Sequence, residues 1–113
     1  MSDEARKKQI IELLKLLASD KQQLEYEKNV PHVDITAELL CMWFDNLFHG
    51  KPPHAEPSFT AEENAALSEF HQFYRARVDR LPKSEGTVQT WLDSAVWRDI
   101  MENARSTLER VAV

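Results

Sequence analysis

The chain contains very little glycine and cysteine. Its 113 residues include two glycines, Gly50 and Gly86, and one cysteine, Cys41. A glycine-rich phosphate loop needs several residues at positive φ and a close approach of the backbone to the ligand. We therefore do not expect nucleotide binding through such a loop. A lone cysteine cannot form an internal disulfide, which is typical of a protein from the reducing cytoplasm.

The sequence also lacks a basic surplus, a signal peptide and a long hydrophobic run. Its net charge is −5, and the acidic excess lies after residue 30. Without a basic stripe, direct binding to nucleic acid is not expected. The charged start has no apolar h-region, and the longest apolar segment is too short to span a membrane. These features indicate a cytoplasmic protein that does not bind membranes. Its acidity suits a basic protein partner, although mild acidity also serves solubility.

Apolar residues recur at helical spacing along most of the chain, and no stretch alternates as a half-buried strand would. The pattern predicts an all-α fold, a compact bundle of four to five helices with no sheet, in a single domain over residues 1–113. The predicted helices run from Ser2 or Asp3 to about Glu27, from Asp34 or Thr36 to Phe48 or His49, from Thr60 to Leu81, over residues 88–92, and from Asp93 or Ser94 to Val111.

Local signals support several of these boundaries. Thr60 and Glu63 have the spacing of a capping box, in which each side chain bonds the backbone N–H of the other. Pro82 stops the preceding helix, and Pro31 biases Val30 away from the helical region.

The most hydrophobic segment is residues 35–48, where ten of fourteen positions are apolar. A helix that is apolar almost all round is expected in the centre of a bundle, here against the first, third and last helices. Cys41 in its middle is expected to be a small buried thiol. Its large side chains are expected to have a wholly internal role, the alternative being that one or two of them face a partner or a second copy. These side chains are Trp43, Phe44, Leu47 and Phe48.

No group of residues has the spacing of a metal site. The four histidines and Cys41 show neither an i, i+4 pair nor a CxxC motif, so we expect no metal and no cofactor. The histidines are His32, His49, His54 and His71.

Catalytic residues are not expected either. Glu38 and Asp45 lie two helical turns apart, roughly 10 Å along the axis, which is too far to share a proton. Asp45 and His49 at i, i+4 form an ordinary helix-surface pair. Cys41 as a nucleophile would need a lowered pKa and a nearby base. The sequence therefore favours a protein that is not an enzyme.

The stretch from Asp45 to Glu63 is the best candidate for a contact surface. It joins a helix end, the proline-rich loop GKPPHAEPS and an acidic helix start, and loops held by a rigid scaffold often carry function. The alternative is a plain connector kept stiff by proline. The candidate partner-binding residues are Asp45, Phe48, His49, His54, Glu56, Glu62 and Glu63.

The order of motifs is similar to that of a known group of proteins. A leucine-rich first helix leads to ELLCMWFDNLFH, then to FTAEENAALSEFHQFYRARVDRLP, and then to VQTWLDSAVWRDIMENARSTLERV. Over most of the chain this resembles small all-helical bacterial proteins, some of them regarded as immunity proteins of polymorphic toxin systems. The resemblance implies a cytoplasmic protein that neutralises a toxin by binding it.

The favoured function is therefore a non-enzymatic protein-binding module, an immunity-type protein that contacts a basic toxin domain through an acidic surface. Charge reversal at Glu62 and Glu63 would weaken that contact. The first alternative is a structural or regulatory homo-oligomer, such as a homodimer joined through residues 35–48. The second is a small helical enzyme or metal-binding protein.

Overall fold

The computed structural model describes residues 3–31, 34–48, 56–82 and 87–111, and these residues form helices joined by short turns, with no strand among them. The prediction of an all-α fold is confirmed. In order along the chain the elements are α1 (Asp3–Ala18), α2 (Asp20–Asn29), α3 (Ile35–Cys41), the π-helical turn η1 (Met42–Leu47), α4 (Ala61–Arg77), the 3-10 turn η2 (Val78–Arg80), α5 (Val88–Leu92) and α6 (Ala95–Val111).

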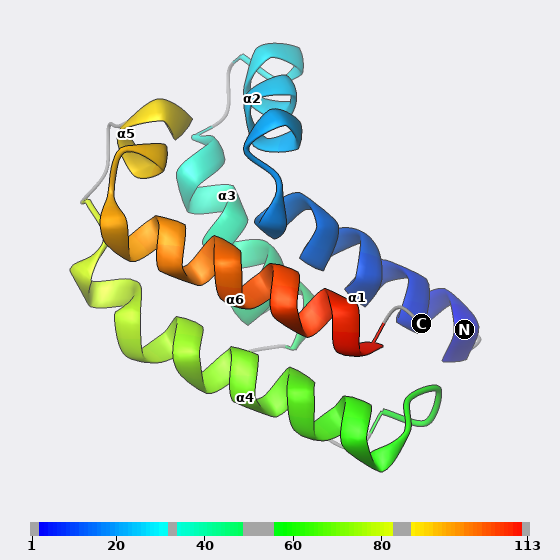
Figure 1. The fold of residues 1–113 in the computed structure, drawn as a ribbon. Helices are drawn as coiled ribbons and strands as arrows, with labels where there is room; N and C mark the ends of the chain where they lie inside the picture. The colour runs from blue at the N-terminus through cyan, green and yellow to red at the C-terminus, as the bar shows by residue number, and fades with distance from the viewer. Residues whose placement is uncertain (1–2, 32–33, 49–55, 83–86, 112–113) are drawn as a thin grey trace.

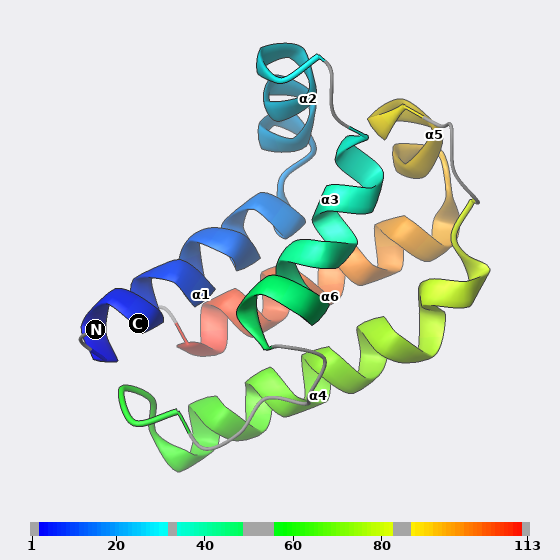
Figure 2. The same cartoon turned by 180° about the vertical axis from the view of Figure 1, so that it is seen from behind.

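The three longest helices form one layer. α6 lies between α1 and α4, packs against both, and runs opposite to each of them (Figure 1). α3 and η1 cross one face of this layer (Figure 2), and α2 and α5 pack together beside the start of α3. The expectation that residues 35–48 form the central helix is therefore wrong, because α6 occupies the middle of the layer. The buried side chains of α6, from Trp97 to Val111, lie between these two neighbouring helices.

The buried apolar side chains form one continuous cluster with an aromatic centre. The Trp43 ring meets the Phe70 ring edge-on, with 4.9 Å between centroids. Tyr74 packs between Phe70 and Trp97, at 5.6 and 6.0 Å. All four rings are fully buried, and buried aromatic rings contribute the largest apolar areas in a core. This cluster joins α3–η1 to the layer beneath it.

The first predicted helix is interrupted at Ser19, so the expected single helix to Glu27 is wrong. Ser19 is extended, with φ −123° and ψ 113°, and its hydroxyl accepts a hydrogen bond from the backbone N–H of Gln22. It is thus the N-cap of a second helix. The break turns the apolar stripe, so that Gln23 is fully buried while Leu24 is 39% exposed.

The Gln23 side chain explains why the break is stable. Its amide nitrogen donates to the carbonyl oxygens of Leu16 and Leu17 at the end of α1, at 3.1 Å each, where the Leu16 carbonyl also accepts from the Ser19 backbone N–H at 3.3 Å. Its amide oxygen accepts from Trp97 Nε1 at 3.0 Å. One side chain therefore satisfies the end of α1 and binds α6 at the same point.

Replacing Gln23 with leucine should lower the free energy of unfolding by about 2–4 kcal/mol, because it removes the hydrogen-bond partner of the buried Leu17 carbonyl and of the Trp97 indole N–H. Urea denaturation of wild type and Gln23→Leu measures the difference. The matched control is Gln22→Leu at an exposed position, which should change stability by less than about 0.5 kcal/mol. Equal effects at the two positions would contradict this account.

Several local predictions are confirmed. Asp34 caps α3, with its side chain accepting from the backbone N–H of Ala37, and the capping box of Thr60 and Glu63 is present in full. Val30 leaves the helical region at φ −129° and ψ 67°. The helix before Pro82 ends through η2, after which the backbone is extended. Within the described segments, no helix has both the length and the apolar character needed to cross a membrane.

Candidate functional site

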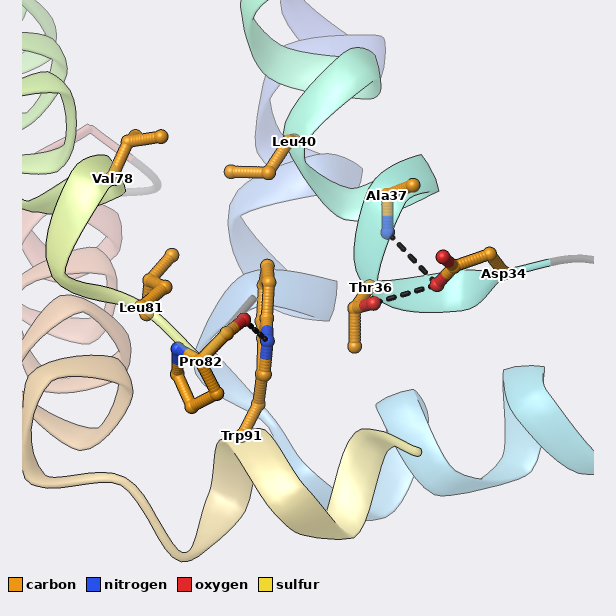
Figure 3. Close-up of a pocket in the computed structure, with 8 residues that line it drawn as sticks. All are labelled: Asp34, Thr36, Ala37, Leu40, Val78, Leu81, Pro82 and Trp91. Atoms are coloured by element: carbon orange, nitrogen blue, oxygen red, sulfur yellow. Dashed lines mark hydrogen bonds between the residues drawn. The ribbon is translucent and has the colours of Figure 1, made fainter. Parts of the chain in front are cut away.

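A surface groove separates α3 and η1 from the end of α4. It consists of two adjoining hollows of about 260 and 300 Å³ that share Val78. Residues lining the larger hollow are Phe44, Arg75, Val78 and Asp79. Residues lining the smaller hollow, drawn in Figure 3, are Asp34, Thr36, Ala37, Leu40, Val78, Leu81, Pro82 and Trp91.

The walls of the smaller hollow are mainly apolar. Leu40 extends from α3 toward Val78 and Leu81 on the opposite side, and the Trp91 ring from α5 closes the end (Figure 3). The Trp91 indole N–H is already used, because it donates to the carbonyl oxygen of Pro82 at 3.1 Å. The lining therefore offers an apolar ligand a surface with few competing polar groups.

Asp34 is the charged residue of this hollow. Its Oδ1 accepts hydrogen bonds from the Thr36 hydroxyl at 2.6 Å and the Ala37 backbone N–H at 3.2 Å. These two bonds hold the pKa of the Asp34 carboxyl below its usual value. The carboxylate is exposed and stays ionised at neutral pH, so the hollow has a fixed negative charge at its edge.

The π-helical turn η1 places Trp43 and Phe44 against His71 of α4. Trp43 Nε1 donates to His71 Nδ1 at 3.1 Å, and the Phe44 ring lies 5.3 Å from the imidazole. His71 is 5% exposed. Burial, and then the charge of Arg75, lowers the pKa of His71. Because Nδ1 accepts the Trp43 N–H, the imidazole in this arrangement is neutral, with its proton on Nε2. Single π turns often occur at functional sites.

Stability should fall on acidification partly through His71. Because its pKa is lower in the folded chain than the ordinary 6.5, its contribution is complete above pH 6.5 and is lost as the pH falls toward the folded value. His71→Gln removes this titration while keeping a side-chain acceptor for Trp43. The loss of unfolding free energy between pH 7 and pH 5, measured by urea denaturation, should be smaller in the variant. The same loss in both proteins would refute the role of His71.

A second recess lies between the start of α4 and the end of α6. It is a shallow hollow of about 600 Å³, which we call the acidic hollow. Its lining residues are Thr60, Glu62, Glu63, Ala65, Glu109 and Arg110. Arg110 is paired with Glu69 at 3.2 Å, at the edge of the hollow. The structure thus brings Glu62 and Glu63 together with Glu109, a third carboxylate that sequence spacing alone does not connect to them.

The other predicted contact residues are distributed differently. Asp45 is exposed, as a partner contact would require. Phe48 is only 5% exposed, because its ring packs 4.7 Å from Trp43 and lies under the Arg6 guanidinium. The expectation of Phe48 as a surface anchor is therefore wrong. His49 and His54 lie outside the described residues.

Glu56 is bound within the molecule. Arg6 donates from Nε at 3.1 Å and from its terminal nitrogen at 2.9 Å to the same carboxylate oxygen, and the Glu56 side chain is 12% exposed. Asn64 also bonds the Glu56 backbone on both its N–H and its carbonyl oxygen. Glu56 therefore fixes the chain to α1 and α4 and has little surface left for a partner.

The larger side chains of residues 35–48 are mostly internal. Trp43 and Leu47 are buried with Phe48, whereas Phe44 is half-buried in the groove.

Cys41, in contrast, is exposed, so the expectation of a buried thiol is wrong. It lies on the outer face of α3, between Glu38 and Asp45. Desolvation and the charges of Asp45 and Glu38 raise the pKa of its thiol.

The Cys41 thiol should be accessible yet slow to react, since only the thiolate is nucleophilic. Ellman's reagent at pH 8 should modify the native protein completely, but more slowly than a cysteine in a short unstructured peptide. Asp45→Asn should accelerate the reaction by removing a nearby negative charge. Asp99→Asn on the exposed side of α6 is the matched control and should leave the rate unchanged. A native rate above that of the peptide would contradict the raised pKa.

Across the segments that the structure describes, no three His, Cys, Asp or Glu side chains converge as ligands for a metal ion. Comparison of the chain with protein-family models, with curated proteins and with solved structures finds no match.

Proposed function

We propose that this chain is a non-enzymatic protein-binding module of the immunity type, which neutralises a basic toxin domain by direct contact. The observation that carries the proposal is the acidic hollow. It gathers Glu62 and Glu63 from α4 with Glu109 from α6. The chain as a whole is acidic, with a net charge of −5.

The charges of this hollow suit a cationic surface. Its one basic residue, Arg110, pairs with Glu69, and three of its six lining residues are glutamates. Exposed ion pairs contribute only about 0–1 kcal/mol each. Their main effect on binding is to steer a basic partner and to fix its orientation, which raises the association rate at low salt.

Helix stability accounts for some of these acids but not for all. Carboxylates in the first turn of a helix are stabilised by its dipole, and Glu63 also completes the capping box by accepting from the Thr60 N–H at 2.8 Å. Glu109 lies in the last turn of α6, where the dipole disfavours a carboxylate. Its partner Arg105, 3.5 Å away, is shared with Glu102. A role in binding explains why Glu109 is acidic.

Charge reversal in the acidic hollow tests the proposal. The probe is the protein encoded next to this chain's gene, provided that it is a basic toxin domain. Glu62→Lys combined with Glu109→Lys should weaken binding by about tenfold or more and should flatten its salt dependence, as measured by calorimetry at low and physiological salt. Glu63 is left intact, because its replacement would damage the helix cap.

The matched control is Glu25→Lys combined with Glu12→Lys, at exposed positions on α2 and α1. This control has the same net charge as the test variant and should keep most of the affinity. Equal loss in both variants would indicate a general charge effect and would reject the acidic hollow as the contact. No complex with the neighbouring toxin domain would reject the proposed function.

The alternative of a homo-oligomer joined through residues 35–48 has less support. Most large side chains of that segment point into the core, and Leu24 is the one large apolar side chain that is exposed within the described segments. A specific dimer usually buries a sizeable, well-packed apolar patch.

A further inference from the structure

We propose that the groove between α3–η1 and the end of α4 is a second binding site, which takes a short linear peptide segment of a partner protein. An apolar side chain of the segment enters the hollow formed by Leu40, Val78 and Trp91. A neighbouring lysine or arginine of the segment pairs with Asp34. This site is separate from the acidic hollow and does not depend on the proposed function.

The size of the groove fits a few residues of an extended chain. Ala37, Leu40 and Phe44 follow one another along its α3–η1 wall at i, i+3 and i+7, which corresponds to roughly 10 Å along a helix. An extended segment covers that distance in about three residues. The two hollows of about 260 and 300 Å³ lie at or below the lower limit of drug-sized pockets, so each suits a side chain.

The polar groups of the smaller hollow select a cation. The Trp91 N–H is donated to Pro82, and the Thr36 hydroxyl is donated to Asp34. The hydrogen bonds from the Thr36 hydroxyl and the Ala37 N–H both go to Oδ1, so an ion pair can form at Oδ2 without breaking these two bonds of the cap. The charge that remains available in this lining is therefore the negative charge of Asp34. A ligand with a basic group beside an apolar one complements it.

A second copy of the chain complements this groove less well. Leu24 is the large apolar side chain that another copy could offer from the described part of its surface. The charges one turn to either side of it on the same helix are mixed and sum to zero: Asp20, Lys21, Glu27 and Lys28. This surface would therefore bring carboxylates as well as ammonium groups toward Asp34. A foreign segment that places a basic residue beside an apolar one, without the acids, complements the lining better.

Selection from a displayed random-peptide library on the intact protein tests the proposal. We expect enrichment of sequences that place Leu, Ile, Phe or Met beside Lys or Arg. A synthetic peptide of the enriched sequence, labelled with fluorescein, then serves as the probe in anisotropy titrations. Recovery of acidic sequences, or of no common pattern, would overturn the proposal.

Two variants distinguish the groove from other surfaces. Ala37→Arg adds bulk and positive charge at an exposed helix position, so the fold should persist while affinity for the probe peptide falls at least tenfold. Asp34→Asn keeps an equally good N-cap but removes the charge, and should weaken binding by up to about fivefold. Circular dichroism confirms that both variants are folded.

Matched controls separate this proposal from the proposed function. Ala76→Arg makes the same substitution at an exposed position on α4 that lines neither hollow, and Glu62→Lys alters only the acidic hollow. Both should bind the peptide normally. Loss of binding in Glu62→Lys with no loss in Ala37→Arg would place the peptide in the acidic hollow and overturn the proposal. Self-association that Ala37→Arg abolishes would assign the groove to a second copy instead, and would overturn it as well.

Discussion

The arrangement of the helices depends on the side-chain amide of Gln23. This amide satisfies the carbonyl groups at the end of α1 and holds the Trp97 indole of α6, so it fixes both the break between α1 and α2 and the position of the layer. The break directs α2 toward α5, where the Glu27 carboxylate accepts a hydrogen bond from the Val88 N–H at 2.8 Å. α5 in turn carries Trp91, which packs 4.6 Å from Trp97 and closes the groove. The buried contact between Gln23 and Trp97 is thus linked, through Trp91, to the shape of the groove.

The sequence predicted those parts of the fold that short-range chemistry decides. The Asp34 cap, the capping box at Thr60 and the helix end before Pro82 all depend on residues within a few positions of one another. The break at Ser19 was missed because the leucine stripe continues across it. The contact that stabilises the break joins Gln23 to Trp97, which lies 74 residues later, and no local pattern reports such a pair.

The same limit applies to the candidate site. Glu62 and Glu63 were expected on a contact surface, but Glu109 and the groove were not, because their parts come from separate helices. Leu40 and Val78 have the helical spacing of core residues, and spacing cannot show that they are only half-buried. The sequence predicts Phe48, at a helix end, and Glu56, in the proline-rich loop, on the contact surface. Phe48 instead packs against Trp43 beneath the Arg6 guanidinium, and Glu56 binds Arg6, which lies 50 residues before it.

Arg6 of α1 contacts two points of the chain at once. Its guanidinium lies over Phe48 and binds the Glu56 carboxylate, so the described segments that end at Phe48 and begin at Glu56 are both held by one side chain of α1. The chain entropy of closing a loop grows only slowly with its length, by about 0.6 kcal/mol for each doubling. Insertions between these two anchors would therefore cost the fold little.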